Sequence, residues 1–111
     1  MTNSEKLAMV KTLLEITDNN TDNTLSVYLD LCKTEILSYL YLQLNGIPPS
    51  VTDVPPEYEV TQVMAVVAGF NIIGAEGQTV SIENGIHRHF KYSDMVEYVR
   101  NHVIPYAGLG G

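Results

Sequence analysis

Apolar residues recur at helical spacing from the N-terminus to Leu44 and predict two helices. The first is expected from about Ser4 to Glu15, because Thr2 and Glu5 have the spacing of a capping box and apolar positions follow every three or four residues. The second, from about Asp22 to Leu44, is the longest predicted element. Its core stripe is expected to comprise Leu25, Tyr28, Leu29, Cys32, Ile36, Tyr39 and Leu40.

A second apolar set on the long helix lies away from that stripe. It consists of Val27, Leu31 and Leu42, with Ser38 between them, and the segment 37–42 is apolar nearly all round. A helix that is apolar all round is normally buried all round, and a chain this short has little protein with which to bury it. We therefore hypothesise that these three residues contact a neighbouring subunit.

Prolines interrupt the helical pattern over residues 47–56, which predicts an extended loop within one domain. Pro56 suits the first turn of a third helix that runs to about Ile73. Its core face is expected to comprise Val60, Val63, Met64, Val67 and Phe70. Another side, made of Ala65, Ala68 and Gly69, is flat enough for a helix to pack closely.

Two short alternating runs follow the glycine-bearing break at 74–77. They are 78–82 and 86–90, joined through Glu83, Asn84 and Gly85, and Asn-Gly between such runs predicts a β-hairpin whose Val80, Ile82, Ile86 and Phe90 face inward. Ser93 is expected to cap a last helix, 94–103, whose apolar face is Met95, Val96, Val99 and Val103. The predicted fold is a small bundle of about four helices, with a hairpin between the third and the fourth.

The residues after Pro105 predict a tail, because proline ends the last helix and three glycines follow within six residues. Tyr106 and Leu109 are its only large apolar side chains. We hypothesise that the tail becomes ordered when it docks on a partner, with Tyr106 as the anchor. The alternative is an end of the chain that has no task.

Composition supports one domain, 1–111, that hides apolar surface against other chains. Apolar residues make up 45 % of the 111 residues and charged residues only 17 %, against a usual charged share of about 25 %. Exposed apolar patches larger than a few hundred Å² usually mark interaction sites. A neutral surface rich in Ser, Thr and Asn is the alternative interpretation.

The net charge of −7 argues against tight DNA binding, because that needs clustered basic residues and the six here are scattered. An acidic surface repels DNA, which suits a channel that DNA passes through better than a surface that binds DNA. No apolar run of signal-peptide length or membrane-spanning length is found, so the chain is expected to be cytoplasmic before any assembly.

Candidate chemistry in the sequence is weak. His87 and His89 lie two apart on a predicted strand, with Glu83 and His102 as possible further zinc ligands, but such a pair is more often a solvated strand face. Cys32 lies on a core stripe, which predicts a buried thiol and not a nucleophile. We predict no enzyme activity, no metal and no cofactor.

The order of these elements resembles the phage head–tail connector (adaptor) family. The likeness covers nearly the whole chain, and its most distinctive part is Gly74 to Phe90, where a Gly-x-Glu-Gly break precedes a run that carries Ser81 and Asn84-Gly85. The resemblance implies a helical subunit that forms a ring beneath the portal, with DNA passing through the channel without sequence-specific binding.

The partners that the resemblance implies are further copies of the chain, the portal protein, and the next connector or tail protein. The implied location is the head–tail junction of the virion, with roles in DNA packaging and virion assembly. The hairpin turn, residues 83–85, is a further hypothesised contact with a neighbour. A small helical regulator or protein-binding module that acts as a monomer or dimer is the alternative function.

Overall fold

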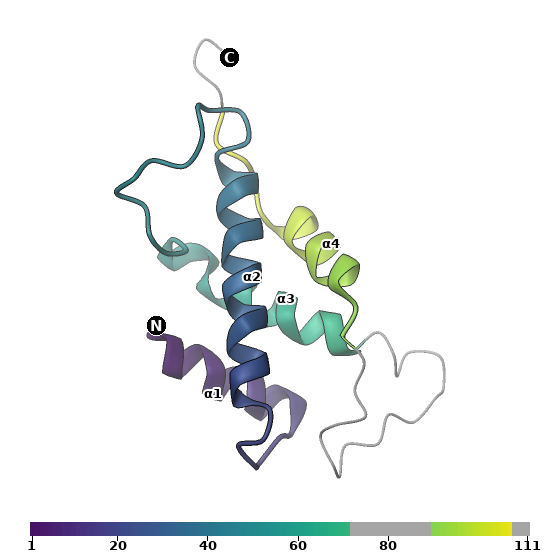
Figure 1. Ribbon diagram of the computed structural model, residues 1–111. Coiled ribbons are helices and arrows are strands. Elements are labelled where there is room, and N and C mark those ends of the chain that lie inside the picture. Colours follow the sequence, from purple (N-terminus) through teal and green to yellow (C-terminus); the bar gives the residue numbers. More distant parts are fainter. Residues whose placement is uncertain (72–89, 108–111) are drawn as a thin grey trace.

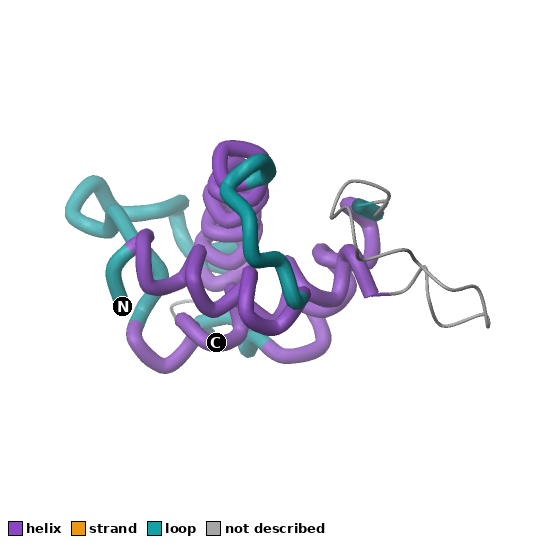
Figure 2. The backbone as a smooth tube through the Cα atoms, turned by 90° about the horizontal axis from the view of Figure 1, so that it is seen from below, coloured by secondary structure: helices purple, strands orange, loops and turns teal. Residues whose placement is uncertain are grey.

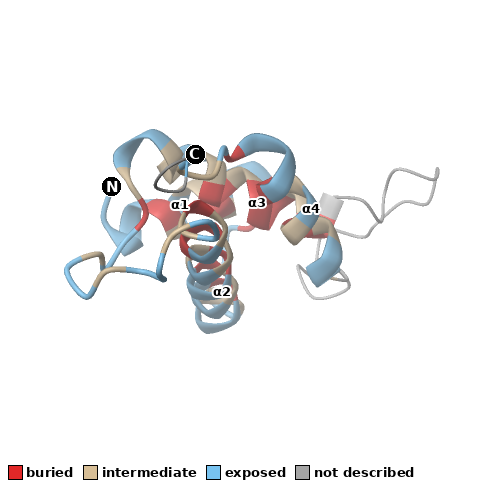
Figure 3. Ribbon diagram, turned by 90° about the horizontal axis from the view of Figure 1, so that it is seen from above, coloured by how far each residue is buried: buried red, intermediate tan, exposed pale blue. Residues whose placement is uncertain are grey.

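The computed structural model describes residues 1–71 and 90–107, and these form four α-helices and one short 3-10 helix (Figure 1). In chain order they are α1 (Asn3–Leu14), α2 (Asp22–Leu40), η1 (Pro56–Tyr58), α3 (Glu59–Asn71) and α4 (Tyr92–His102). Helix α3 contacts each of the other three α-helices. Helices α1, α3 and α4 lie on one side of α2, as the view from above shows (Figure 3).

The first helix begins with the predicted capping box. The Glu5 amide donates to Thr2 Oγ1 at 3.1 Å, and the Thr2 amide donates to Glu5 Oε1 at 2.7 Å, so two N–H groups that the helix leaves unpaired are satisfied. Glu15 ends the helix in the left-handed region, at φ 59°. The prediction of this helix is confirmed.

The long helix α2 buries the predicted stripe but ends earlier than expected. Leu25, Leu29, Cys32, Ile36 and Leu40 are buried, and Tyr28 and Tyr39 pack against them. The helix stops at Leu40 and not at Leu44, because the chain turns there and Leu42 donates its amide to the Tyr39 carbonyl. Gly46 then adopts φ 98°, a conformation that glycine reaches without strain.

The burial of α3 differs from the prediction. Val63, Val67 and Phe70 are buried as expected, but Val60 is 52 % exposed, and Ala65, which was assigned to another side, is fully buried. The physical reason is that three helices surround α3 and cover a wide arc of its surface, which leaves Val60 outside. The glutamine at position 62 is also buried.

The last helix begins at Tyr92, so the prediction that Ser93 caps it is wrong. Lys91 is the N-cap and makes no side-chain capping bond. Its amide instead donates to the Gly69 carbonyl at 3.0 Å, which fixes the start of α4 to the end of α3. Met95 and Val99 form the buried side of α4, as predicted, and Val103 is buried just after it.

The predicted fold class is wrong in its β part, because the described residues contain helices and loops but no strand. Most of the hairpin, residues 78–89, lies outside the described residues. Phe90 lies within them and belongs to a loop. Its ring stacks on Tyr28 at 3.7 Å between centroids and meets Phe70 edge-on at 5.0 Å. Gly69 lets the ring come this close, because a Cβ there would lie 2.5 Å from Phe90 Cε1.

Candidate interaction surface

The side of α2 that faces away from the other helices carries exposed apolar residues. They are Val27 and Leu31 on the helix and Leu42 in the turn that follows it, hereafter together the outer face of α2, and they are 53 %, 38 % and 65 % exposed. Val27 and Leu31 are one turn apart, and Thr34 and Ser38 continue the row, so it carries no charge from Val27 to Leu42. Figure 3 shows exposed residues along this side of the helix.

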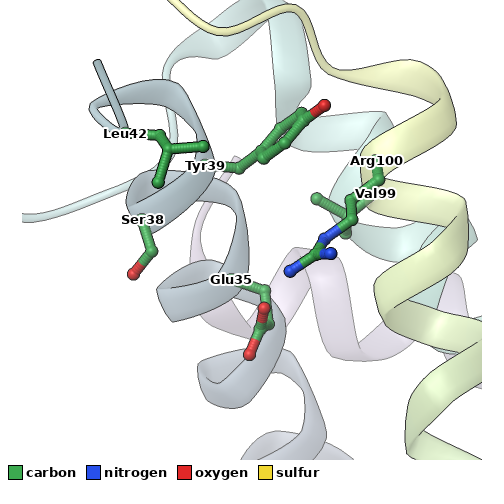
Figure 4. Close-up of a pocket in the computed structure, with 6 residues that line it drawn as sticks. All are labelled: Glu35, Ser38, Tyr39, Leu42, Val99 and Arg100. Carbon is green, nitrogen blue, oxygen red and sulfur yellow. The ribbon is translucent and has the colours of Figure 1, made fainter.

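The outer face borders a cleft between α2 and α4. Six residues line the cleft, which has a volume of about 160 Å³ (Figure 4): Glu35, Ser38, Tyr39, Leu42, Val99 and Arg100. The Arg100 guanidinium lies over the Tyr39 ring, 5.9 Å from its centroid. Leu42 thus belongs to both surfaces. The sequence interpretation missed the cleft, because its lining comes from two helices that are far apart along the chain.

Glu35 is already held by α4. The Tyr92 hydroxyl donates a hydrogen bond to Glu35 Oε2. This bond, together with burial, raises the pKa of Tyr92 to about 12, because losing the proton would place a second negative charge beside the carboxylate. The contact joins α2 to α4 and is a structural one.

Cys32 lies on the buried side of α2 and is not a nucleophile. Its thiol lies 3.6 Å from the Gln62 carbonyl, and burial, followed by the negative charge of Glu35, raises its pKa to about 12. A reactive cysteine needs a thiolate and access to solvent, and Cys32 has neither. The prediction of a buried thiol is confirmed.

A buried lysine attaches the proline-rich loop to α1. The Lys6 side chain is fully buried, and its Nζ lies 3.2 Å from Asp53 Oδ1. Burial of Asp53 opposes ionisation, but hydrogen bonds from the Val54 amide and from Lys6 outweigh it and hold the pKa of Asp53 below its ordinary value. The sequence interpretation counts Lys6 only among the scattered basic residues, since nothing in its local pattern marks burial.

The residues after α4 pack on their own chain as far as the structure describes them. The Ile104 amide donates to the Tyr58 hydroxyl at 3.3 Å, and the Tyr106 amide donates to the Leu40 carbonyl at 2.9 Å. The Tyr106 ring meets Tyr41 edge-on at 5.1 Å, and partial burial raises the pKa of Tyr106. Docking of Tyr106 on a partner stays a prediction, and Leu109 lies outside the described residues.

The other candidate site residues lie outside the described part of the chain. Glu83, Asn84 and Gly85, the predicted contact at the turn, fall in the gap between 71 and 90, as do His87 and His89. Within the described ranges no group of three or more His, Cys, Asp or Glu side chains could hold a metal ion. No helix there is long and apolar enough to cross a membrane.

Comparison with known proteins places the chain beside a phage protein family. A family model described as "Phage gp6-like head-tail connector protein" matches residues 4–102. The matched segment runs from the first turn of α1 to the last residue of α4. No curated protein and no solved structure matches the chain significantly.

Proposed function

Because this chain belongs to the phage gp6-like head-tail connector family and is a structural connector protein, we propose that its copies form a ring beneath the portal. The ring extends the DNA channel and links the capsid to the tail. In this arrangement the portal protein binds one side of the ring, and the next connector or a tail protein binds the other.

The observation that carries the proposal is the extent of the family match. It covers all four α-helices, so the likeness concerns the whole helical body and not a single helix pair. Family membership implies interaction with portal and tail components and a place in the virion. The presence of the free chain in the host cytoplasm before assembly belongs to the proposal.

We assign contacts between neighbouring copies to the outer face of α2. An uncharged row with large apolar side chains is unusual on the solvent side of a helix, where polar and charged residues normally stand. Its three large residues remain 38–65 % exposed in the single chain. Covering them with a neighbour removes apolar area from water and stabilises the assembly by roughly 25 cal/mol for each Å².

The acidic balance of the chain supports a passive DNA channel. With a net charge of −7, a ring of copies carries a large negative charge close to the genome. Phosphates and carboxylates repel each other, so DNA passes without being held and without sequence-specific contacts.

The test is co-expression with the portal protein of the same phage, followed by purification on a tag carried by the portal. The wild-type chain is expected to purify with the portal in many copies. Leu31→Asp places a charge on the outer face of α2 and is expected to keep its helical circular dichroism while losing most of the bound copies.

A matched control is Ser26→Asp, which adds the same charge at an exposed position of α2 outside the row. This variant is expected to bind the portal normally. If the wild-type chain fails to bind its portal, the proposed function is wrong. If Leu31→Asp loses its helical signal, Leu31 supports the fold and not the assembly.

A further inference from the structure

The chain carries a second exposed apolar surface, and we propose that it is the partner of the outer face of α2 in the next copy. This α3 surface consists of Val60, Met64 and Ile104. Val60 is 52 % exposed, Ile104 is 76 % exposed, and Met64 is partly exposed. The Ile104 amide bonds to the hydroxyl of Tyr58, the residue that precedes α3, so Ile104 lies beside the end of α3 that carries Val60. The inference rests on the proposed function and adds which surfaces meet.

The two surfaces point in opposite directions. On α2, Val27 is nine residues from the fully buried Ile36, which is two and a half turns at about 3.6 residues per turn, so Val27 faces away from the core. On α3, Gln62 faces α2, because its Nε2 donates to the Leu29 carbonyl at 2.8 Å. Val60 is two residues from Gln62, a rotation of about 200°, so it faces away from α2.

Views of the backbone from two sides agree with this arrangement. Figure 2, seen from below, and Figure 3, seen from above, both show α2 at the margin of the helical body, so its outer side is open to a neighbour. The outer face of α2 therefore lies on one side of the α2–α3 pair, and Val60 lies on the other.

Opposite surfaces favour a head-to-tail contact over a two-fold dimer. A two-fold dimer pairs a patch with the same patch, so a dimer through α2 leaves Val60 and Ile104 exposed. A head-to-tail contact covers both surfaces of every copy and repeats, and it closes into a ring when the rotation between copies permits. The occupant of the outer face of α2 is thus the α3 surface of a second copy.

The size of the outer face predicts that the contact is weak when the chain is alone. From Val27 to the end of α2 at Leu40 the row is roughly 20 Å long, at 1.5 Å per residue, and a helix is about 10 Å wide. The resulting area of about 200 Å² is a fraction of the roughly 800 Å² that each partner buries in a stable interface. The portal is therefore expected to bring the copies together and to make the contact persist.

The test is cysteine cross-linking on the portal with the full-length chain. Leu31→Cys and Val60→Cys are made as separate single variants and as one double variant, and a short bismaleimide joins thiols that meet. The native Cys32 gives no background, because it is fully buried. Val27→Cys and Met64→Cys place the thiol about one helical turn away, in case the two helices meet in a shifted alignment. Ser26→Cys is the matched control on α2.

The expected result is a cross-linked dimer only when an α2 variant is mixed with an α3 variant, and a ladder of multimers from the double variant. Ser26→Cys is expected to give neither. A dimer from Leu31→Cys alone would indicate a two-fold contact and overturn the inference. Portal-bound chains that give no α2–α3 cross-link in any of the four pairings of an α2 variant with an α3 variant would also overturn it. The proposed function would then still stand, because binding to the portal is measured separately.

Discussion

Neutralising Asp53 should destabilise the fold more than neutralising its partner Lys6, because the two side chains differ in burial. Lys6 is fully buried, whereas the Asp53 side chain is 50 % exposed. The variant Asp53→Asn keeps the size of the side chain and leaves the lysine ammonium in the interior without an anion. The variant Lys6→Met removes the buried charge and keeps most of the aliphatic stem, and water can still solvate the remaining carboxylate.

The magnitude follows from two limiting cases. Removing one partner of a fully buried pair costs about 3–5 kcal/mol, and an exposed pair contributes about 0–1 kcal/mol. The pair here lies between these limits, so Asp53→Asn is expected to cost about 2 kcal/mol and Lys6→Met less than about 1 kcal/mol. In a domain near this size each kcal/mol lowers Tm by about 4 °C, so Asp53→Asn should lose about 8 °C.

The assay is urea unfolding followed by helical circular dichroism, with the double variant Lys6→Met/Asp53→Asn included. The double variant should be about as stable as Lys6→Met alone, because no buried charge is left to be unpaired. Equal losses for the two single variants, or losses that simply add in the double variant, would refute the reasoning.

The same pair predicts a dependence on acid. The pKa of Asp53 is lower in the folded chain than its ordinary value of 3.8, so its carboxylate stabilises the fold above that value. This contribution is lost as the pH falls through the lower pKa of the folded state. Lys6→Met should flatten that part of the curve of stability against pH.

Three further predictions concern other contacts. Gly69→Ala should lower the free energy of unfolding by about 1–3 kcal/mol, because the new methyl group forces the Phe90 ring away. The loss should be clearly smaller in a Phe90→Ala background. Equal losses in the two backgrounds would show that the close approach is not the cause. Cys32 should not react with a soluble disulfide reagent in the folded chain and should react on unfolding in urea, so rapid reaction without urea would contradict its burial. Truncation after Val103 should lower the free energy of unfolding by about 1–2 kcal/mol, because it removes the hydrogen bonds that Ile104 and Tyr106 make. It should also weaken attachment to the portal. Normal stability would contradict the first expectation, and a normal yield of joined heads and tails would contradict the second.

The helices could be predicted because each one shows in the spacing of apolar and capping residues that are close together in the sequence. The buried row on α2 repeats every three or four residues, and the Thr2–Glu5 capping box involves neighbours only. The resemblance to head–tail connectors rests on the order of such elements, and the family match confirms it.

The errors arise where distant parts of the chain decide the outcome. Val60 fits the apolar repeat of α3, yet no helix in the described part of the chain covers it. Lys6 is buried only because the loop brings Asp53 to it, 47 residues further along the chain. Phe90 suits a strand by its side chain, but it packs against Tyr28 and Phe70 and belongs to a loop.

The candidate surface was predictable in part for the same reason. The outer face of α2 follows from residues that miss the core stripe of their own helix. The α3 surface could not be predicted, because it depends on which side of α3 the other helices leave uncovered and on the return of the chain to Tyr58.

Electron cryomicroscopy of the chain purified together with its portal protein is the most direct test of the proposed ring. The account predicts a closed ring of copies seated on the portal around a central channel. In each copy the outer face of α2 should be covered by the α3 surface of the adjacent copy. Copies attached singly to the portal, with Val27 and Leu31 facing solvent, would contradict it.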